Sequence, residues 1–394
     1  MAVKSADIDA PPAGIDALAE RYDPEVIDLP GGRALVRLAV SGGEAWDARL
    51  TGRRLKLLRS PDTREPDAVI TADAATWQRV ADDVRGGMRA FQRGRLRMRG
   101  SLHIGVGFLA ATSGSDDPGR LRFESLRTRS GRISILSAGT GRRLLLCVHG
   151  LGGTKASFLP TVAALADDFQ VVAMDLPGFG ESDKPIGAPY DSPWFARSVF
   201  HTLDALGVDR AHLAGNSMGG RVALEAGLTE SERVRSLTLL SPALAWLRDR
   251  RWALLVRVLR PELGLVQPAP RAVIEGLVRR FVPGGDDGWS AAGVDEFLRA
   301  YLSPRGRAAF YAAARNIYLD EPHGDDGFWT RLAGLQPKSL FIWGRDDTLV
   351  PVGFRRYVEE ALPSARHRVL HCGHVPQLER PGETHAAMRA FLDA

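Results

Sequence analysis

The feature that most constrains the fold is a serine between glycines, in the run Gly215-Asn216-Ser217-Met218-Gly219-Gly220. A short apolar run, His212–Ala214, predicts a strand before it, and Arg221–Ala226 predicts a helix after it. The order strand, sharp turn, helix is typical of a nucleophile elbow, in which a strained turn exposes the serine Oγ above a sheet. Gly215 and Gly219 leave room where a Cβ would strike a neighbouring element. Alone, Gly-x-Ser-x-Gly is a weak signal, and an ordinary strand–helix turn with a surface serine is the alternative.

A second glycine-rich loop, His149-Gly150-Leu151-Gly152-Gly153, follows the apolar strand predicted at Leu144–Val148. Glycines at Gly150 and beyond let backbone amides approach the negative oxygen that develops when a serine attacks a carbonyl. We expect the amides of Leu151 and Met218 to form this oxyanion hole.

A candidate acid and a candidate base each follow a predicted late strand. Asp347 lies in the run Trp343–Pro351, and His374 lies in Cys372–Pro376. In a triad the histidine takes the serine proton, and the carboxylate fixes the imidazole tautomer and stabilises the imidazolium. The order Ser, Asp, His along the chain distinguishes one triad fold from the two other common ones. Asp346 is the alternative acid.

Three other histidines are interpreted as structural. His371 competes with His374 for the role of base, but it lies within or at the end of a predicted strand. His149 is expected to hold the glycine loop by a hydrogen bond, and His212 is expected to be a satisfied core histidine.

Residues 125–394 alternate short β-runs with longer amphipathic stretches, which predicts a mostly parallel, doubly wound sheet. The predicted strands are Ile133–Leu136, Leu144–Val148, Val171–Met174, His212–Ala214, Leu237–Leu240, Leu340–Trp343 and Arg366–Leu370. From about residue 242 to 337 the alternation of strands and helices stops, and we expect an inserted helical lid there. Its candidate substrate-contacting residues are Leu247, Trp252 and Leu255, unless these form only the core of the lid itself.

Residues 25–113 read as a smaller α+β domain. Strands are predicted at 34–40, 45–50, 53–58 and 68–71, with a tight turn at Thr51-Gly52. A helix is predicted at 74–83, followed by an alternating segment at 94–100 and a closing helix at 103–111. The face expected to be apolar on the helix at 74–83 consists of Thr76, Trp77, Val80 and Ala81. Residues 1–24 are expected to be a flexible or weakly helical N-terminus, and residues 114–124 a polar linker.

Residues 125–394 resemble the α/β-hydrolase superfamily. In that family the acid lies in a W-G-x-x-D-x-x-x-P turn, which favours Asp347 over Asp346. The base lies in G-H-x-x-x-x-E-x-P, matched here by Gly373, His374, Glu379 and Pro381. The resemblance implies a serine hydrolase with Ser217 as nucleophile. It disfavours the relatives with an aspartate nucleophile, such as dehalogenases and epoxide hydrolases.

Two resemblances bear on the substrate. The elbow run at 215–220 is similar to that of hydrolases that cleave carbon–carbon bonds in meta-ring-fission products. The loop at 175–182, Asp-Leu-Pro-Gly-Phe-Gly-Glu-Ser, looks more like that of general esterases and lipases. We therefore expect cleavage of a carboxylic ester, with carbon–carbon cleavage as the alternative.

Residues 25–113 resemble the sterol carrier protein type 2 domain. The meander, the run Pro66–Thr71, the helix that follows it and the run Ala90–Gly100 carry this resemblance. It implies an apolar tunnel for a lipid, sterol or acyl chain, which points to an apolar ester as substrate. The alternatives are a domain that lost its cavity and only packs or dimerises, or a lipid-transfer protein whose hydrolase domain is inactive.

Composition narrows the remaining possibilities. The formal charge of +5 permits attraction to anionic surfaces and does not require a nucleic-acid partner. With two cysteines, no apolar signal segment and no membrane-span-length run, the chain is expected to be cytoplasmic, with peripheral membrane contact through the lid as a further expectation. No His/Cys cluster has metal-ligand spacing, and we expect neither metal nor cofactor.

Overall fold

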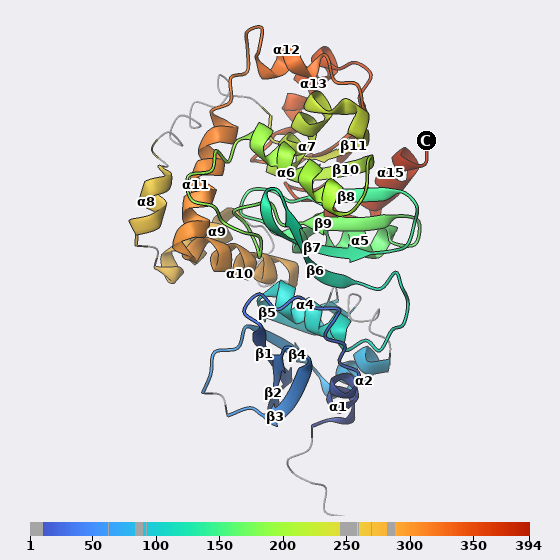
Figure 1. The fold of residues 1–394 in the computed structure, drawn as a ribbon, viewed down its shortest axis with the longest axis vertical. Coiled ribbons are helices and arrows are strands. Elements are labelled where there is room, and N and C mark those ends of the chain that lie inside the picture. Colours follow the sequence, from blue (N-terminus) through green and yellow to red (C-terminus); the bar gives the residue numbers. More distant parts are fainter. Residues whose placement is uncertain are drawn as a thin grey trace, which may run out of the picture. The chain divides into compact units, whose positions relative to one another are not determined.

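The fold is that of a computed structural model. It describes residues 11–61, 63–82, 90–91, 93–244, 258, 260–268, 270–281 and 288–394. The chain divides into two compact units (Figure 1). The first unit comprises Met1–Phe123 and Gly284–Asp295, and the second comprises Glu124–Pro283 and Glu296–Ala394. The segment at 284–295, which we predicted as part of the second domain, thus groups with the first unit.

A five-stranded sheet forms the centre of the first unit, in the order β3-β2-β1-β4-β5. Its strands are β1 (Arg33–Val40), β2 (Ala45–Thr51), β3 (Arg54–Arg59), β4 (Ala68–Ala72) and β5 (Leu96–Gly100). Strand β1 runs antiparallel to β2 and parallel to β4. Gly52, with φ +51°, makes the tight turn between β2 and β3 that Thr51-Gly52 predicts. The predicted meander is therefore confirmed.

Helices α1 (Ala13–Glu20), α2 (Ala74–Asp82) and α4 (Leu102–Ala111) belong to the same unit. The buried residues of α2 are Thr76, Trp77, Val80 and Ala81, the face that we expected from the sequence. Helix α1 agrees with the weakly helical alternative for residues 1–24, of which residues 1–10 lie outside the described part of the chain. Its Ile15 and Leu18 side chains are completely buried, and a Cβ on Gly14 would lie 2.8 Å from the backbone of α2, so α1 packs closely on α2.

The second unit contains an eight-stranded sheet in the order β13-β12-β11-β10-β8-β9-β7-β6. Its strands are β6 (Arg122–Thr128), β7 (Gly131–Ala138), β8 (Leu144–Val148), β9 (Gln170–Met174), β10 (Ala211–Asn216), β11 (Val234–Leu240), β12 (Lys338–Gly344) and β13 (Arg366–Leu370). The ladders from β9 to β13 are parallel, and β7 pairs antiparallel with β9. This confirms the mostly parallel sheet. Strand β6 was not predicted, and its first three residues lie in what we expected to be linker.

The loops that carry the candidate site residues follow the carboxyl ends of the parallel strands β8, β10, β12 and β13. Helix α7 (Met218–Thr229) starts directly after β10 and packs against β10, β11 and α6 (Ser192–Ala205). Short helices η1 (Lys155–Phe158) and α5 (Leu159–Leu165) follow the loop after β8. The chain ends with η4 (Val352–Phe354), α13 (Arg355–Ala361), α14 (Pro376–Glu379) and α15 (Pro381–Leu392).

Between residues 242 and 337 every element in the described part of the chain is a helix. These helices are α8 (Pro261–Val266), α9 (Arg271–Phe281), α10 (Gly288–Leu302), α11 (Pro304–Tyr318) and α12 (Phe328–Leu332). The helical character agrees with the prediction, while action as a lid stays a prediction. The candidates Leu247, Trp252 and Leu255 lie outside the described residues. None of the described helices is both long and apolar enough for a membrane span.

Candidate active site

Ser217 stands at a strained turn between β10 and α7. Its backbone has φ 53° and ψ −117°, a conformation that a residue with a side chain adopts only when its surroundings impose it. A Cβ on Gly215 would lie 2.2 Å from the Gly219 carbonyl oxygen, and one on Gly219 would lie 2.0 Å from the Val148 carbonyl oxygen. Both glycines are therefore required by close backbone approach, as the elbow interpretation predicted.

Asp347 and His374 meet after β12 and β13. Asp347 Oδ2 lies 2.7 Å from His374 Nδ1, and the Asp347 side chain is fully buried. Its other oxygen, Oδ1, accepts hydrogen bonds from the amides of Leu349 and Val350, each 2.8 Å long. Asp346, in contrast, is exposed. The geometry therefore pairs the base candidate with Asp347 rather than with its neighbour.

Backbone and side-chain hydrogen bonds fix the histidine loop beside the elbow. Asn216 Nδ2, one residue before the serine, donates to the His374 carbonyl at 3.0 Å. Glu379 accepts hydrogen bonds from the amides on both sides of the histidine, Gly373 at 2.6 Å and Val375 at 2.9 Å. This explains physically why a glutamate five residues after the histidine belongs to the motif, because its carboxylate closes the loop.

The glycine loop after β8 lies next to the serine. A Cβ on Gly150 would come within 3.1 Å of the Ser217 Cβ, so the predicted donor Leu151 follows a residue in contact with the elbow. The Gly150 carbonyl accepts hydrogen bonds from Gly153 N at 3.0 Å and from His149 Nδ1 at 2.8 Å. In a trans peptide unit the C=O and the next N–H point in opposite directions. Fixing the Gly150 carbonyl therefore also fixes the direction of the Leu151 amide.

His149 is held in one tautomer. The Leu176 amide donates to His149 Nε2 at 3.0 Å, so the proton of the neutral ring is on Nδ1, where it can be donated to Gly150 O. Burial lowers the pKa of His149 despite the opposing effect of the nearby Asp175 carboxylate, which keeps the ring neutral at pH 7. The predicted loop-holding hydrogen bond of His149 is confirmed.

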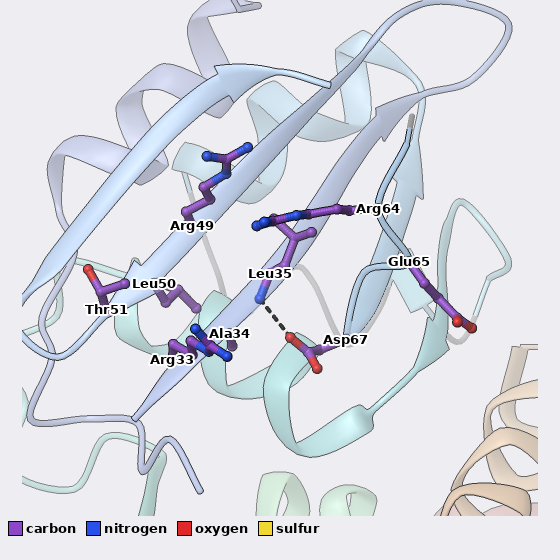
Figure 2. A pocket seen from close by; sticks show the side chains of 9 residues that line it. All are labelled: Arg33, Ala34, Leu35, Arg49, Leu50, Thr51, Arg64, Glu65 and Asp67. Carbon is purple, nitrogen blue, oxygen red and sulfur yellow. Dashed lines mark hydrogen bonds between the residues drawn. The ribbon is translucent and has the colours of Figure 1, made fainter. Parts of the chain in front are cut away.

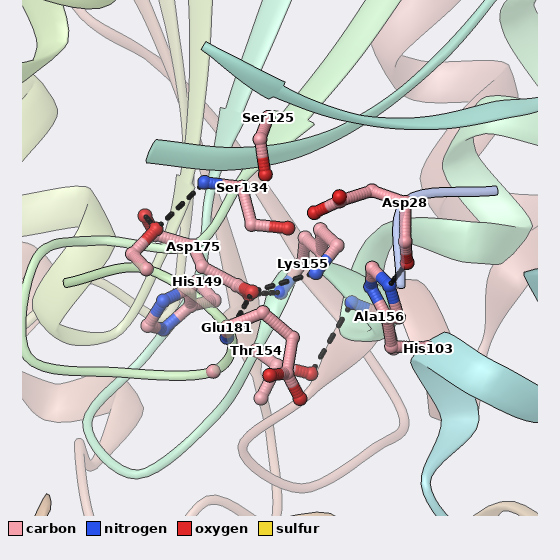
Figure 3. A network of polar contacts seen from close by, with 12 residues as sticks. Asp28, His103, Ser125, Ser134, His149, Thr154, Lys155, Ala156, Asp175 and Glu181 are labelled. Atoms are coloured by element: carbon pink, nitrogen blue, oxygen red, sulfur yellow. Dashed lines mark hydrogen bonds and ion pairs between the residues drawn. The ribbon is translucent and has the colours of Figure 1, made fainter. Parts of the chain in front are cut away.

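A buried ion pair supports this loop from the side of β9 (Figure 3). Lys155 Nζ lies 2.6 Å from Asp175 Oδ2, with side chains 2 % and 0 % exposed. The backbone amides of Lys155 and Glu181 also donate to Asp175, at 2.7 and 2.8 Å. Burial alone would raise the pKa of Asp175, but the Lys155 ammonium and the hydrogen bonds from Lys155 outweigh it and lower the pKa to about 2. The carboxylate is therefore ionised at pH 7, and it ties the start of η1 to the loop after β9.

Three aromatic residues that the sequence did not reveal lie beside the glycine loop. A Cβ on Gly152 would touch the rings of Phe297 and Phe310, from α10 and α11. Tyr301 stacks on Phe297 with ring centroids 5.3 Å apart and meets Phe310 edge-on at the same distance. All three rings are partly exposed. They offer an apolar surface next to the predicted oxyanion hole, and only their helical spacing in the insert could have signalled them.

The remaining candidate groups take no part in this geometry. His371 is exposed just beyond β13, and His212 is buried with Nδ1 2.7 Å from Ser236 Oγ. Both cysteines are buried, and burial raises the pKa of the Cys372 thiol to about 12. In the described part of the chain, no three His, Cys, Asp or Glu side chains are grouped to hold a metal ion.

Comparison with known families gives two matches. The family model described as "alpha/beta hydrolase fold" matches residues 143–381. The model described as "SCP-2 sterol transfer family" matches residues 19–108. The two models fall on the two regions that the sequence had separated, one with the candidate triad and one with the five-stranded sheet.

Individual proteins resemble the hydrolase region. The dihydrolipoyllysine-residue acetyltransferase component of the acetoin cleaving system of Cupriavidus necator is 29 % identical, over 66 % of this chain and 66 % of its own length. A second relative is the 2-hydroxy-6-oxononadienedioate/2-hydroxy-6-oxononatrienedioate hydrolase of Paraburkholderia phymatum. It is 28 % identical, over 66 % of this chain and 91 % of its own length. The crystal structure of a membrane phospholipase A, a bacterial virulence factor, is 29 % identical with a TM-score of 0.56, covering 69 % of this chain and 86 % of that one.

Proposed function

The chain belongs to the alpha/beta hydrolase fold family, and from that premise we propose that it is a serine hydrolase cleaving a carboxylic ester of an apolar, lipid-like substrate. The observation that carries the proposal is the strained Ser217 elbow together with the 2.7 Å contact between His374 Nδ1 and Asp347 Oδ2. These three side chains follow the chain order that this fold uses for nucleophile, acid and base.

In the proposed reaction, Ser217 Oγ attacks the ester carbonyl while His374 Nε2 accepts its proton. Asp347 keeps the proton of the neutral ring on Nδ1 and stabilises the imidazolium. The negative oxygen of the tetrahedral intermediate accepts hydrogen bonds from the Leu151 and Met218 amides. When the intermediate collapses, His374 gives its proton to the leaving alcohol, and an acyl-Ser217 remains. Water, deprotonated by His374, then releases the acid and restores the serine.

Several observations favour an apolar ester. The partly exposed rings of Phe297, Tyr301 and Phe310 lie against the glycine loop, where the acyl or alcohol part of a substrate would pass. A second family match, to sterol-transfer proteins, accompanies the hydrolase region in the same chain. One similar structure is named as a phospholipase A, whose substrates are lipid esters.

A carbon–carbon hydrolase is the second candidate. The relative from Paraburkholderia phymatum is named for a keto dicarboxylate that contains no ester, so its hydrolysis must break a carbon–carbon bond. A ring-fission dienone and an aryl ester of similar size separate the two functions. Turnover of the dienone at a kcat/KM above that of the ester would replace our proposal by this one.

Labelling with a fluorophosphonate tests the proposal directly, because the reagent reacts with an activated serine. The full chain should be labelled at Ser217 and should hydrolyse aryl esters, and Ser217→Ala should lose both. Asp347→Asn should lower kcat about 10⁴-fold, as loss of the tautomer-fixing carboxylate does in serine proteases. Asp346→Asn is the matched control, and its kcat should stay within about 2-fold of the wild-type value because Asp346 is exposed. An unlabelled Ser217 in the folded chain would instead support a lipid-binding protein with an inactive hydrolase region.

A further inference from the structure

One face of the five-stranded sheet carries more cations than it can neutralise. On β1 the side chains of Ala34, Val36 and Leu38 are buried, so Arg33, Leu35 and Arg37 lie on the other face. Arg37 is neutralised by Asp47, with Arg37 Nε 2.9 Å from Asp47 Oδ1. Other cations share this region of the sheet and its neighbouring loop. They are Arg33, Arg49, Arg54, Lys56 and Arg64, and none of them forms an ion pair with another described residue.

Arg49 has the least favourable surroundings of this set. It pairs with Leu35 on one side and stands directly opposite Lys56 on the other. Like charges directly opposite each other destabilise a sheet. Its Nε is buried and has no hydrogen-bond partner among the described residues. A buried donor without a partner is costly, so an acceptor placed at Arg49 Nε would stabilise this part of the sheet.

A pocket of about 370 Å³ opens at this point (Figure 2). Its lining residues are Arg33, Ala34, Leu35, Arg49, Leu50, Thr51, Arg64, Glu65 and Asp67. Among the described residues, neither acid of the pocket forms an ion pair with these arginines. Asp67 Oδ2 accepts a hydrogen bond of 2.8 Å from the Leu35 amide, and Glu65 points away from the three arginines in Figure 2. The pocket therefore combines three guanidinium groups with one apolar side chain on the same face of the sheet, that of Leu35.

We propose that this pocket binds a phosphate monoester carried on a small amphiphile. Guanidinium groups donate paired hydrogen bonds to phosphate oxygens, and three of them reach this pocket from three segments, β1, β2 and the loop before β4. The bound anion would separate the opposed charges of Arg49 and Lys56 and accept from the unpaired Nε. The Leu35 side chain offers an apolar contact for the carbon part of such a ligand. A soluble phosphate ester and a lipid headgroup share this chemistry.

Calorimetric titration of the full chain with glycerol 3-phosphate and with inorganic phosphate tests the soluble source. Flotation with phosphatidylcholine vesicles, with and without phosphatidic acid, tests the lipid source. Arg49→Gln and Arg64→Gln should each weaken binding about 10-fold or more, the loss expected for one charged hydrogen-bonding partner. Arg97→Gln, at β5 on the far edge of the same sheet, removes an equal charge and should change binding by less than about 2-fold.

The outcomes separate clearly. If the protein binds glycerol 3-phosphate and Arg49→Gln weakens this binding, the ligand is a soluble ester. If it binds only phosphatidic acid vesicles, and this binding depends on Arg49, the ligand is a lipid headgroup. Either result supports the site. Absence of both, or an equal loss in Arg97→Gln, overturns it. Phosphate should also raise the unfolding temperature of the wild type more than that of Arg49→Gln. If Arg49→Gln fails to fold, Arg64→Gln decides, since the Arg64 side chain is exposed.

Discussion

At the scale of single residues, the neighbours of the candidate catalytic groups explain how those groups are held in place. Ser217, Asp347 and His374 are recognisable by motif, but each is placed by a neighbour with no catalytic role of its own. Asn216 and Glu379 bind the histidine loop, and the elbow glycines admit backbone at distances that no other residue allows. The Leu151 amide depends in the same way on His149, through the carbonyl of Gly150.

His149→Phe tests that dependence. The variant keeps an aromatic ring that can contact Phe179, but it loses the bond to the Gly150 carbonyl and the acceptor for the Leu176 amide. We expect kcat to fall about 10- to 100-fold with KM within about 3-fold, less than the loss of an entire oxyanion donor. Affinity for a trifluoromethyl ketone, which forms the tetrahedral adduct, should fall in parallel with kcat/KM. His371→Phe, at an exposed position, serves as control. Unchanged ketone affinity in a folded variant would contradict the positioning role.

At the scale of elements, apolar runs and turn chemistry predicted most of the fold. Strands β8 and β13 begin and end where the sequence indicated. Strand β8 is buried and continuously apolar, as expected of a parallel strand covered on both faces. Strand β13 is an edge strand of mixed polarity, and the turn residues on either side of it set its bounds. Strand β6 was missed because it is an edge strand of mixed polarity, whose pairing depends on β7. Helix α1 was expected only as a weakly helical alternative, because Ile15 and Leu18 are too few to show a period and its stability comes from packing on α2.

The candidate site also contains residues that the sequence predicted and residues that it did not. Residues in glycine-bounded turns were predictable, since close backbone approach demands those residue types at fixed spacing. Phe297, Tyr301 and Phe310 were not, since helices of an insert present side chains at helical spacing whatever they contact. Which of them faces the glycine loop is decided by the packing of α10 and α11, and no local pattern records that packing.

The ion pair between η1 and the end of β9 leads to a prediction about stability. Lys155→Met leaves the buried Asp175 carboxylate uncompensated and should cost about 3–5 kcal/mol at pH 7, measured by urea unfolding. The pKa of Asp175 is lowered in the folded wild type, so its stabilising contribution is present above its ordinary pKa and is lost as the pH falls toward 2. In the variant, burial without the ammonium should raise that pKa, and protonation should relieve the penalty.

The difference in stability between wild type and Lys155→Met should therefore narrow as the pH falls from 7 to about 4. Lys338→Met is the matched control, because Lys338 is exposed at the start of β12 and makes no ion pair with a described residue. Its free energy of unfolding should stay within about 0.5 kcal/mol of the wild type. If the difference in free energy of unfolding between wild type and Lys155→Met does not change with pH, lost packing rather than the buried charge causes the destabilisation.

At the scale of the whole molecule, one chain joins a hydrolase region to a region that matches sterol-transfer proteins. Each unit has its own sheet. The sterol-transfer match lies within the first unit, and the hydrolase match covers strands β8 to β13 of the second. The first unit is not confined to the N-terminal part of the sequence, because residues 284–295 from the helical insert group with it. A shortened chain that begins at Leu121 therefore removes most of the first unit but keeps this segment.

If the first unit supplies long-chain substrate to the candidate triad, removing that unit should lower the activity on long-chain esters more than the activity on short-chain esters. We expect the full chain to hydrolyse long-chain aryl esters with a kcat/KM about 10-fold above that of the chain beginning at Leu121, because a lipid-binding unit raises the local concentration of an apolar substrate. For short-chain esters, which need no carrier, the kcat/KM values of the full and the shortened chain should agree within about 2-fold. Equal rates of fluorophosphonate labelling at Ser217 serve as the control that the shortened chain keeps a working site. Chain-length preference that is unchanged by the truncation, in a chain that still labels normally, would show that the first unit serves another ligand, and the arginine-lined pocket would then be the place to look for it.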